Sequence, residues 1–169
     1  MKLHIGGESA KAGWKILNIQ AKANVDYIGD ISDLSQFESD TFEEVYASHV
    51  FEHVMQKDII KTLQGIYRII KSGGQLHISV PDLDKLCALY LDKTLNFEQR
   101  WHVMRMIFGG QVDSFDFHYV GWNEESLSAY LTHTGFSHIK KVDFFGLFED
   151  TSNFSPYGSP ISLNITATK

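Results

Sequence analysis

Residues 43–82 read EEVYASHVFEHVMQKDIIKTLQGIYRIIKSGGQLHISVPD, and this block decides the fold. It holds a short apolar strand at 45–47, a polar stretch, an amphipathic helix, and a second apolar strand at 75–80 that ends at Pro81. A strand, a helix and a second strand in this order form a right-handed β-α-β crossover. The block therefore predicts two parallel strands that belong to a larger sheet.

The helix in this block has the clearest periodicity in the sequence. Its apolar residues share one helical face: Ile59, Ile60, Leu63, Ile66, Tyr67 and Ile70. Lys71 suits the negative end of the helix, and Gly73 and Gly74 supply left-handed conformations that stop a helix. We therefore expect the helix to run up to these glycines.

The remaining elements follow from shorter patterns. Strands are predicted at 2–5, 15–20, 26–29, 139–145 and 161–168. Asp82 and Asn123 are predicted to cap two further helices. Another helix carries an aromatic stripe that we expect to fill the core: Phe97, Trp101, Met104 and Phe108. Residues 109–118 are predicted to form a long loop.

These elements predict the fold class. We expect an α/β protein with a doubly wound, mostly parallel seven-stranded sheet, helices on both faces, and one antiparallel strand near the C-terminus. With 169 residues, the chain suits a single domain over 1–169. Such sheets bind ligands at the carboxyl ends of their strands, so side chains that follow the strands should converge there.

Composition narrows the choice of partners. The formal net charge is -6 and the sequence has no stripe of Lys or Arg, which predicts no nucleic-acid partner. No apolar run reaches the length of a membrane span, so no membrane partner is expected. The lone Cys87 cannot form an internal disulfide, which favours a cytoplasmic location. The sequence does not indicate the oligomeric state.

The ordered segments resemble the class I S-adenosylmethionine-dependent methyltransferases. The matching pieces are KLHIGG at 2–7, GWKILNIQ at 13–20, YIGDISDL at 27–34, VYASHVFEHV at 45–54 and IYRIIKSGGQLHISVPDL at 66–83. The resemblance extends to small branches of this superfamily that begin directly at the first strand and often act in sugar or surface-polysaccharide pathways. It therefore implies S-adenosylmethionine as the cofactor.

The resemblance also assigns cofactor-binding residues by position. It implies that the amides of the first turn hold the methionine carboxylate, that the residue ending the second strand binds the ribose, and that the residue after the third strand meets the adenine. The candidate residues are Gly6, Gly7, Glu8, Gln20, Asp30, Ile31, Ser48 and His49. Asp30 could equally cap a turn, and Ser48 with His49 could equally satisfy loop backbone.

Two of these positions depart from the family pattern. Glu8 stands where a glycine is usual, and it would be strained if that position required a positive φ. Its charge could also repel the carboxylate of the cofactor. Gln20 replaces an acidic residue, and an amide accepts weaker hydrogen bonds from ribose hydroxyls than a carboxylate does. The Gln20 change would lower cofactor affinity, whereas the Glu8 carboxylate could instead pair with the free amine of the cofactor. Both changes could also mean that the pocket has lost its cofactor.

His49 and His118 are the candidate catalytic residues, because an imidazole can accept a proton near neutral pH. A solvent-facing structural role for His118 remains open. His49 and His53 are four residues apart, a spacing that also occurs in metal sites. No third ligand is assured and the HExxH order is absent, so no metal is predicted.

The sequence therefore predicts an S-adenosylmethionine-dependent methyltransferase with a small-molecule substrate, and the resemblance suggests a sugar or polysaccharide precursor. The alternative, motivated by Glu8 and Gln20, is a non-catalytic binding or regulatory module on the same fold. A nicotinamide-dependent oxidoreductase is disfavoured because the first turn lacks G-x-G-x-x-G.

Overall fold

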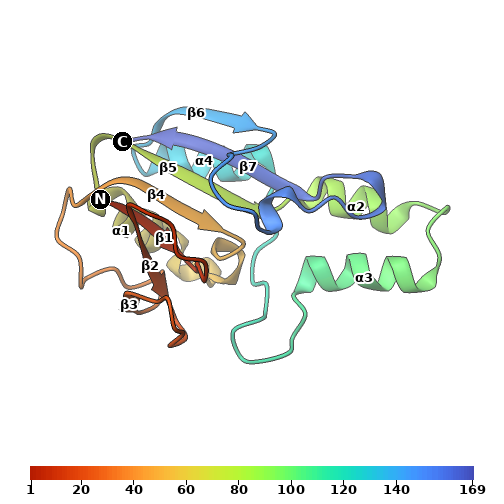
Figure 1. Ribbon diagram of the computed structural model, residues 1–169. Helices are drawn as coiled ribbons and strands as arrows, with labels where there is room; N and C mark the ends of the chain where they lie inside the picture. The colour runs from red at the N-terminus through yellow and green to blue at the C-terminus, as the bar shows by residue number, and fades with distance from the viewer.

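A twisted sheet of seven strands, in the order β3-β2-β1-β4-β5-β7-β6, forms the centre of the computed structural model, which describes all of residues 1–169 (Figure 1). The strands are β1 (Lys2–Ile5), β2 (Trp14–Asn18), β3 (Tyr27–Ile28), β4 (Phe42–Ser48), β5 (Ile70–Pro81), β6 (Ser137–Val142) and β7 (Ser162–Thr168). Strand β7 runs antiparallel to both of its neighbours, β5 and β6, and all the other strand pairs are parallel. The predicted fold class, with one antiparallel strand near the C-terminus, is confirmed.

The helices are α1 (Ile59–Ile69), α2 (Leu83–Leu91), α3 (Phe97–Phe108) and α4 (Glu124–His133), with short 3-10 turns at Phe51–His53, Gln56–Asp58, Thr151–Asn153 and Pro156–Gly158. Helices α1 and α4 pack on one face of the sheet (Figure 1). Leu3, Val45 and Leu76 lie side by side on that face and are fully buried. None of the helices combines the length and the apolar character needed to cross a membrane.

The opposite face is covered differently from our expectation of helices on both faces. His4 and Tyr46 are neighbours on this face and are buried. Phe148, from the loop between β6 and β7, packs against both rings with centroid distances of 4.1 and 5.0 Å, and Phe145 packs against Tyr46 at 5.5 Å. Aromatic loop residues therefore take the place of a helix here.

The helix α1 ends earlier than the glycine pair predicted. It stops at Ile69, and β5 begins at Ile70, which pairs with Phe42 of β4 before the register shifts. Gly73 adopts a φ of +76°, and a Cβ on Gly74 would lie 2.7 Å from the carbonyl oxygen of Glu43. The two glycines therefore form an irregular stretch within β5 that lies close to β4, and they do not stop the helix.

The prediction that the aromatic stripe of α3 fills the core is wrong. Helices α2 and α3 pack against each other and extend beyond the sheet, where Leu86 and Val103 form a small separate core (Figure 1). Phe97 is 72% exposed and Trp101 is 55% exposed. Helix α3 therefore buries the side that carries Val103, which packs against α2. Its aromatic side has no helix to cover it.

Candidate functional site

The loop after β1 is held in place by an asparagine from β2. Gly6 adopts a φ of +79° and its amide donates to the carbonyl of Leu17 at 2.7 Å. The Asn18 side-chain amide donates to the carbonyls of Gly6 and Gly7 at 3.3 and 3.1 Å. Because the Gly6 amide is already used, it is not free to bind a ligand. Sequence reasoning missed Asn18, although its place at the end of an apolar strand was a usable signal.

Gly7 has a packing role that the sequence did not reveal. It is buried, and a Cβ at this position would lie 2.5 Å from Nδ1 of His4. Burial of His4 lowers its pKa to about 4, so the imidazole beneath the loop is neutral at pH 7. Gly7 therefore allows the loop to lie directly on this buried ring.

Neither objection to Glu8 as a cofactor-binding residue holds in the structure. Its φ does not lie in the left-handed region, which is occupied by Gly6. The Glu8 carboxylate forms an ion pair with Lys22, and the Asn24 side chain donates to the Glu8 carbonyl at 3.0 Å. The negative charge that departs from the family pattern is thus balanced by a lysine fourteen residues later, which sequence reasoning also missed.

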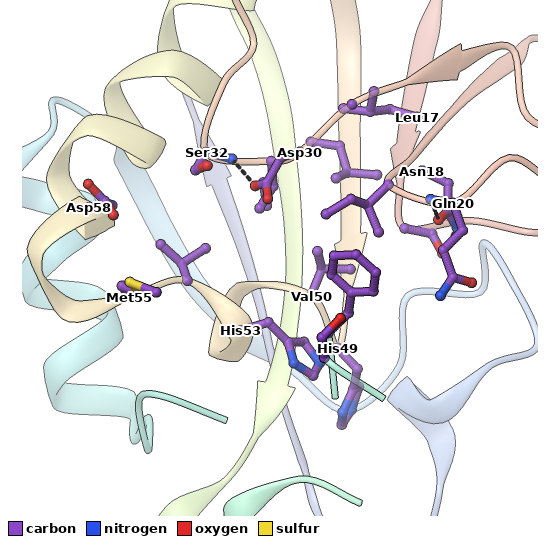
Figure 2. A pocket seen from close by; sticks show the side chains of 18 of the residues that line it. Leu17, Asn18, Gln20, Asp30, Ser32, His49, Val50, His53, Met55 and Asp58 are labelled. Atoms are coloured by element: carbon purple, nitrogen blue, oxygen red, sulfur yellow. Dashed lines mark hydrogen bonds between the residues drawn. The ribbon is translucent and has the colours of Figure 1, made fainter. Parts of the chain in front are cut away.

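A cavity of about 420 Å³ lies at the carboxyl ends of the first strands, and we call it the larger cavity (Figure 2). Six of the predicted site residues line it: Gly6, Glu8, Gln20, Asp30, Ile31 and His49. The predicted residues Gly7, Ser48 and His118 do not. Lys22 and Asn18 line it, as do Ser114, Phe115 and Tyr119 from the long loop between α3 and α4.

Asp30 holds a turn and also lines the larger cavity. Its Oδ1 accepts a hydrogen bond from the Ser32 amide at 2.8 Å, so it holds a turn. It is among the residues that line this cavity, and Figure 2 shows its carboxylate beside Ser32, joined by that hydrogen bond. Gln20 lies on the other side of the cavity. Its backbone amide donates to Oδ1 of Asn18 at 2.9 Å, and this hydrogen bond fixes the backbone after β2.

A second cavity of about 390 Å³ adjoins the first, and both share His49 and His53. We call it the second cavity. Its lining residues are largely polar: His49, Glu52, His53, His102, Arg105, Asp116, His118 and Thr151, with Pro81, Met106, Gly110, Phe154 and Ile161. The candidate catalytic residues His49 and His118 therefore meet here, although they lie 69 residues apart in the sequence.

His49 directly follows β4 in an uncommon backbone conformation, with a φ of +52°. Its amide donates to the carbonyl of Ser79 at 2.9 Å, and its Nε2 lies 2.8 Å from Oγ of Ser162. A non-glycine residue in the left-handed region costs about 1 kcal/mol. The flanking strands hold this strain and direct the ring between the two cavities.

Three histidines surround the carboxylate of Glu52, which is 1% exposed. Oε1 of Glu52 lies 3.3 Å from Nδ1 of His49 and 4.0 Å from Nε2 of His118. The rings of His53 and His118 meet edge to face with centroids 4.8 Å apart. Sequence reasoning named the histidines but missed Glu52.

The electrostatics of this cluster lower the pKa of both the Glu52 carboxyl and the His118 imidazole. Burial alone would raise the pKa of Glu52, and the neighbouring His49, His53 and His118 imidazoles outweigh it and hold the pKa below its ordinary value. Burial lowers the pKa of His118, against the opposing effect of Glu52. His118 can therefore present a lone pair at neutral pH.

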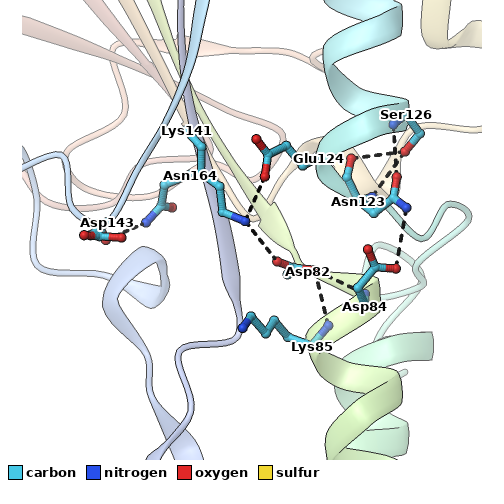
Figure 3. Close-up of polar contacts among 9 residues, drawn as sticks. All are labelled: Asp82, Asp84, Lys85, Asn123, Glu124, Ser126, Lys141, Asp143 and Asn164. Carbon is cyan, nitrogen blue, oxygen red and sulfur yellow. Dashed lines mark hydrogen bonds and ion pairs between the residues drawn. The ribbon is translucent and has the colours of Figure 1, made fainter.

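Asp82, which follows β5 at the same edge of the sheet, has a structural role (Figure 3). Its Oδ1 accepts from the amides of Asp84 and Lys85 at 3.1 and 3.3 Å, which caps α2 as predicted. Lys141 of β6 lies 3.9 Å from Asp82 and 3.0 Å from Glu124 of α4. Asp82 lines neither cavity and joins α2 to the end of the sheet.

Comparison with known proteins agrees with this arrangement. Residues 8–78 match the family model described as a methyltransferase domain. No curated protein matches the sequence.

Several solved structures have the same fold. The chain is similar to an S-adenosylmethionine-dependent methyltransferase from Archaeoglobus fulgidus, with 18% identity, a TM-score of 0.61, and coverage of 99% of this chain and 85% of that chain. It is similar to a possible histamine N-methyltransferase from Thermotoga maritima, with 20% identity, a TM-score of 0.64, and coverage of 99% and 81%. It is also similar to phosphoethanolamine N-methyltransferase 2 from Haemonchus contortus in complex with S-adenosyl-L-methionine, with 16% identity, a TM-score of 0.56, and coverage of 99% and 48%.

The sheet order and the antiparallel β7 show that the chain has the fold of these methyltransferase structures, and the domain match covers residues 8–78 of it. The structure from Archaeoglobus fulgidus is described as dependent on S-adenosylmethionine, and the one from Haemonchus contortus contains it.

Proposed function

We propose that the protein transfers a methyl group from S-adenosylmethionine to a small molecule. The observation that carries this proposal is the pair of adjoining cavities at the carboxyl edge of the sheet, which share His49 and His53. One cavity can hold the cofactor and the other the acceptor, so that the methyl group lies between them. A volume of about 420 Å³ for the larger cavity is within the range of small-molecule sites.

The lining of the larger cavity suits the parts of the cofactor. Lys22, paired with Glu8 beside the loop after β1, offers a positive charge for the methionine carboxylate, and Glu8 can meet its amine. Gln20 lies where it can accept from the ribose hydroxyls. Asp30 makes no hydrogen bond through Oδ2 within the protein, so this oxygen can accept from the adenine amine beside Ile31.

The second cavity suits a hydroxylated acceptor, such as a sugar derivative or a polysaccharide precursor. Arg105 and His102 supply donors, and Asp116 and Thr151 supply acceptors. His49 and His118 face the acceptor side of the junction, where they can assist the loss of a proton from a hydroxyl.

Methyl transfer depends mainly on how the acceptor is placed relative to the methyl group. Bound S-adenosylmethionine supplies an electrophilic methyl group. The chain holds the acceptor oxygen in line with that group, and the loop residues Phe115 and Tyr119 help to exclude water from the larger cavity. Orientation of this kind supplies much of the acceleration of a displacement reaction.

Isothermal titration with S-adenosylmethionine and S-adenosylhomocysteine tests the cofactor assignment. Asp30→Ala should weaken binding about 10-fold, which corresponds to about 1.4 kcal/mol. Asp33→Ala is the matched control, because Asp33 also holds a turn, through Ser35 at 3.1 Å, but does not line the cavity. The absence of heat for the unmodified protein at millimolar ligand would contradict the proposal.

A binding or regulatory module remains the second candidate, because Gln20 occupies a position where the resemblance implies an acid. Transfer of a labelled methyl group to a panel of hydroxylated compounds separates the two functions. Cofactor binding without transfer to any compound in the panel would favour the module.

A further inference from the structure

The carboxylate of Glu52 lacks a hydrogen-bond donor in a fully buried position. Neither Oε1 nor Oε2 accepts a hydrogen bond, and Glu52 is 1% exposed. A buried charge without a partner is strongly unfavourable, so such groups are normally paired with a cation or bound to a metal. The nearest nitrogens, on His49 and His118, do not donate to it at 3.3 and 4.0 Å.

The protons of two neighbouring histidines point away from this carboxylate. Nδ1 of His53 lies 3.0 Å from the carbonyl oxygen of Phe117, which can only accept, so Nδ1 carries the proton and Nε2 is left with a lone pair. Ser162 donates its proton to the Thr151 carbonyl at 2.9 Å and therefore accepts from Nε2 of His49 at 2.8 Å.

In the tautomer that this hydrogen bond selects, the lone pair of His49 Nδ1 faces Oε1 of Glu52. Two acceptors then face each other at 3.3 Å, which is repulsive unless a positive charge lies nearby. The hydrogen bonds that fix the outer nitrogens of His49 and His53 are of the kind that orient metal-binding histidines.

We infer that Glu52, His53 and His118 form a binding site for a divalent transition-metal ion, with His49 beside it. One ligand atom from each of the three residues lies within 4.8 Å of the others. Ligand atoms around a tetrahedral ion stand about 3.3 Å apart, given bonds of about 2.0 to 2.1 Å, so modest side-chain rotation closes the site. Two imidazoles and a carboxylate that leave open positions are typical of Zn²⁺ and Fe²⁺ sites.

The place of the site indicates what the ion would do. His53 lines both cavities, and Glu52 and His118 line the second, so the open positions face the proposed acceptor. A hydroxyl bound there loses its proton to solvent more readily because the ion stabilises the oxygen anion. The oxygen lone pair then forms the O–CH₃ bond, the S–CH₃ bond breaks, and its electron pair remains on sulfur. In this role, which rests on the proposed function, His118 binds the ion and does not itself take the proton.

The experiment begins with protein stripped by a chelator and dialysed, without S-adenosylmethionine. Titration with Co²⁺, followed by visible d–d absorption and by calorimetry, should show saturable binding of one ion per chain, which Zn²⁺ displaces. Glu52→Gln and His118→Ala should each lower the affinity about 100-fold, by analogy with the loss of ligand-supporting groups. His133→Ala, which removes an exposed histidine of α4, should leave the affinity unchanged.

The stability of the stripped Glu52→Gln variant separates a metal site from a structural pair. The inference expects the variant to unfold at the same temperature as the stripped parent or at a higher one, because a buried charge without a donor is removed. A clear loss of stability together with no Co²⁺ binding by the parent would show instead that Glu52 is the partner of a charged His49, and would overturn the inference. Equal Co²⁺ affinity in all variants would also overturn it.

A third possibility is that Glu52 serves the positive sulfur of the cofactor. In that case Glu52→Gln would weaken S-adenosylmethionine but not S-adenosylhomocysteine, and the parent would bind no Co²⁺. Cofactor binding to the stripped parent is measured in the same series. Failure of the metal site therefore stays distinct from failure of the proposed function.

Discussion

Replacement of Gly6 by alanine should destabilise the protein through two separable effects. The φ of +79° at Gly6 costs an alanine about 1 kcal/mol. The new Cβ would also lie 2.3 Å from Cγ2 of Val50, and overlap of this kind in a packed region costs about 1 to 3 kcal/mol. The free energy of unfolding should therefore fall by about 2 to 4 kcal/mol, which lowers Tm by about 4 to 16 °C for a chain of this size.

Gly13 provides a matched control, because its φ is +83° and a Cβ there would meet nothing within 4 Å. Gly13→Ala should show only the conformational effect, about 1 kcal/mol. Urea unfolding of Gly6→Ala, Val50→Ala and the double variant then isolates the overlap, since the double variant should lose less stability than the sum of the single ones. Equal destabilisation by Gly6→Ala and Gly13→Ala would refute the reasoning.

Three further predictions concern pH, the exposed helix and the end of the sheet. Because burial lowers the pKa of His4 from 6.5 to about 4, the unfolded chain binds a proton in that interval that the folded protein does not, so stability should fall by up to about 3 kcal/mol as pH drops through it. His4→Phe should remove that part of the decline in urea unfolding between pH 7 and 4.5, and an unchanged decline would count against it. Trp101→Ala should change the unfolding free energy by less than about 0.5 kcal/mol, whereas Val103→Ala, fully buried on the same helix, should cost about 2 kcal/mol, and a reversed order in thermal unfolding would show that the α3 stripe is covered in solution. Asp82→Ala should cost about 1 to 2 kcal/mol while Asp82→Asn, which keeps an acceptor for the α2 amides, costs less, and equal losses in calorimetry would instead assign the effect to the ion pair with Lys141.

The local patterns in the sequence were sufficient for most of the fold. The apolar residues of 59–70 and the strand ending at Pro81 determined one crossover, and the caps Asp82 and Asn123 determined two helix starts. These features are local, because periodicity and capping depend on residues within a few positions of one another. Strand ends were less certain: the second strand ends at Asn18 and not at Gln20.

Errors arose where local patterns allow two tertiary outcomes. Gly73 and Gly74 can stop a helix or permit close approach in a sheet, and only the pairing of Ile70 with Phe42 decides between them. The stripe on α3 was predicted to be buried because it is apolar. The stripe is exposed because α2 and α3 pack together beyond the sheet. The spacing of apolar residues along the sequence does not indicate where a helix lies relative to the sheet.

The candidate site was predictable in its location but not in its charges. The rule that ligands bind at the carboxyl ends of parallel strands identified Gly6, Gln20, Asp30 and His49 as residues that converge, and they line one cavity. The partner of Glu8 is Lys22, which lies in the next connection. That pairing requires the two loops to be neighbours in space, and the sequence contains no local sign of it.

His49 shows why strain is a better guide to this site than residue type. The sequence contains eight histidines, and nothing in their spacing distinguishes a ligand from a packing residue. Only the structure shows that His49 has a φ of +52° while its ring lies against the buried carboxylate of Glu52. A glycine in place of His49 would remove about 1 kcal/mol of backbone strain. Backbone stability therefore does not explain why an imidazole stands at this position. The hydrogen bond of that imidazole with Ser162 helps to offset the strain, and the ring lies beside Glu52 at the end of β4, where it lines both cavities.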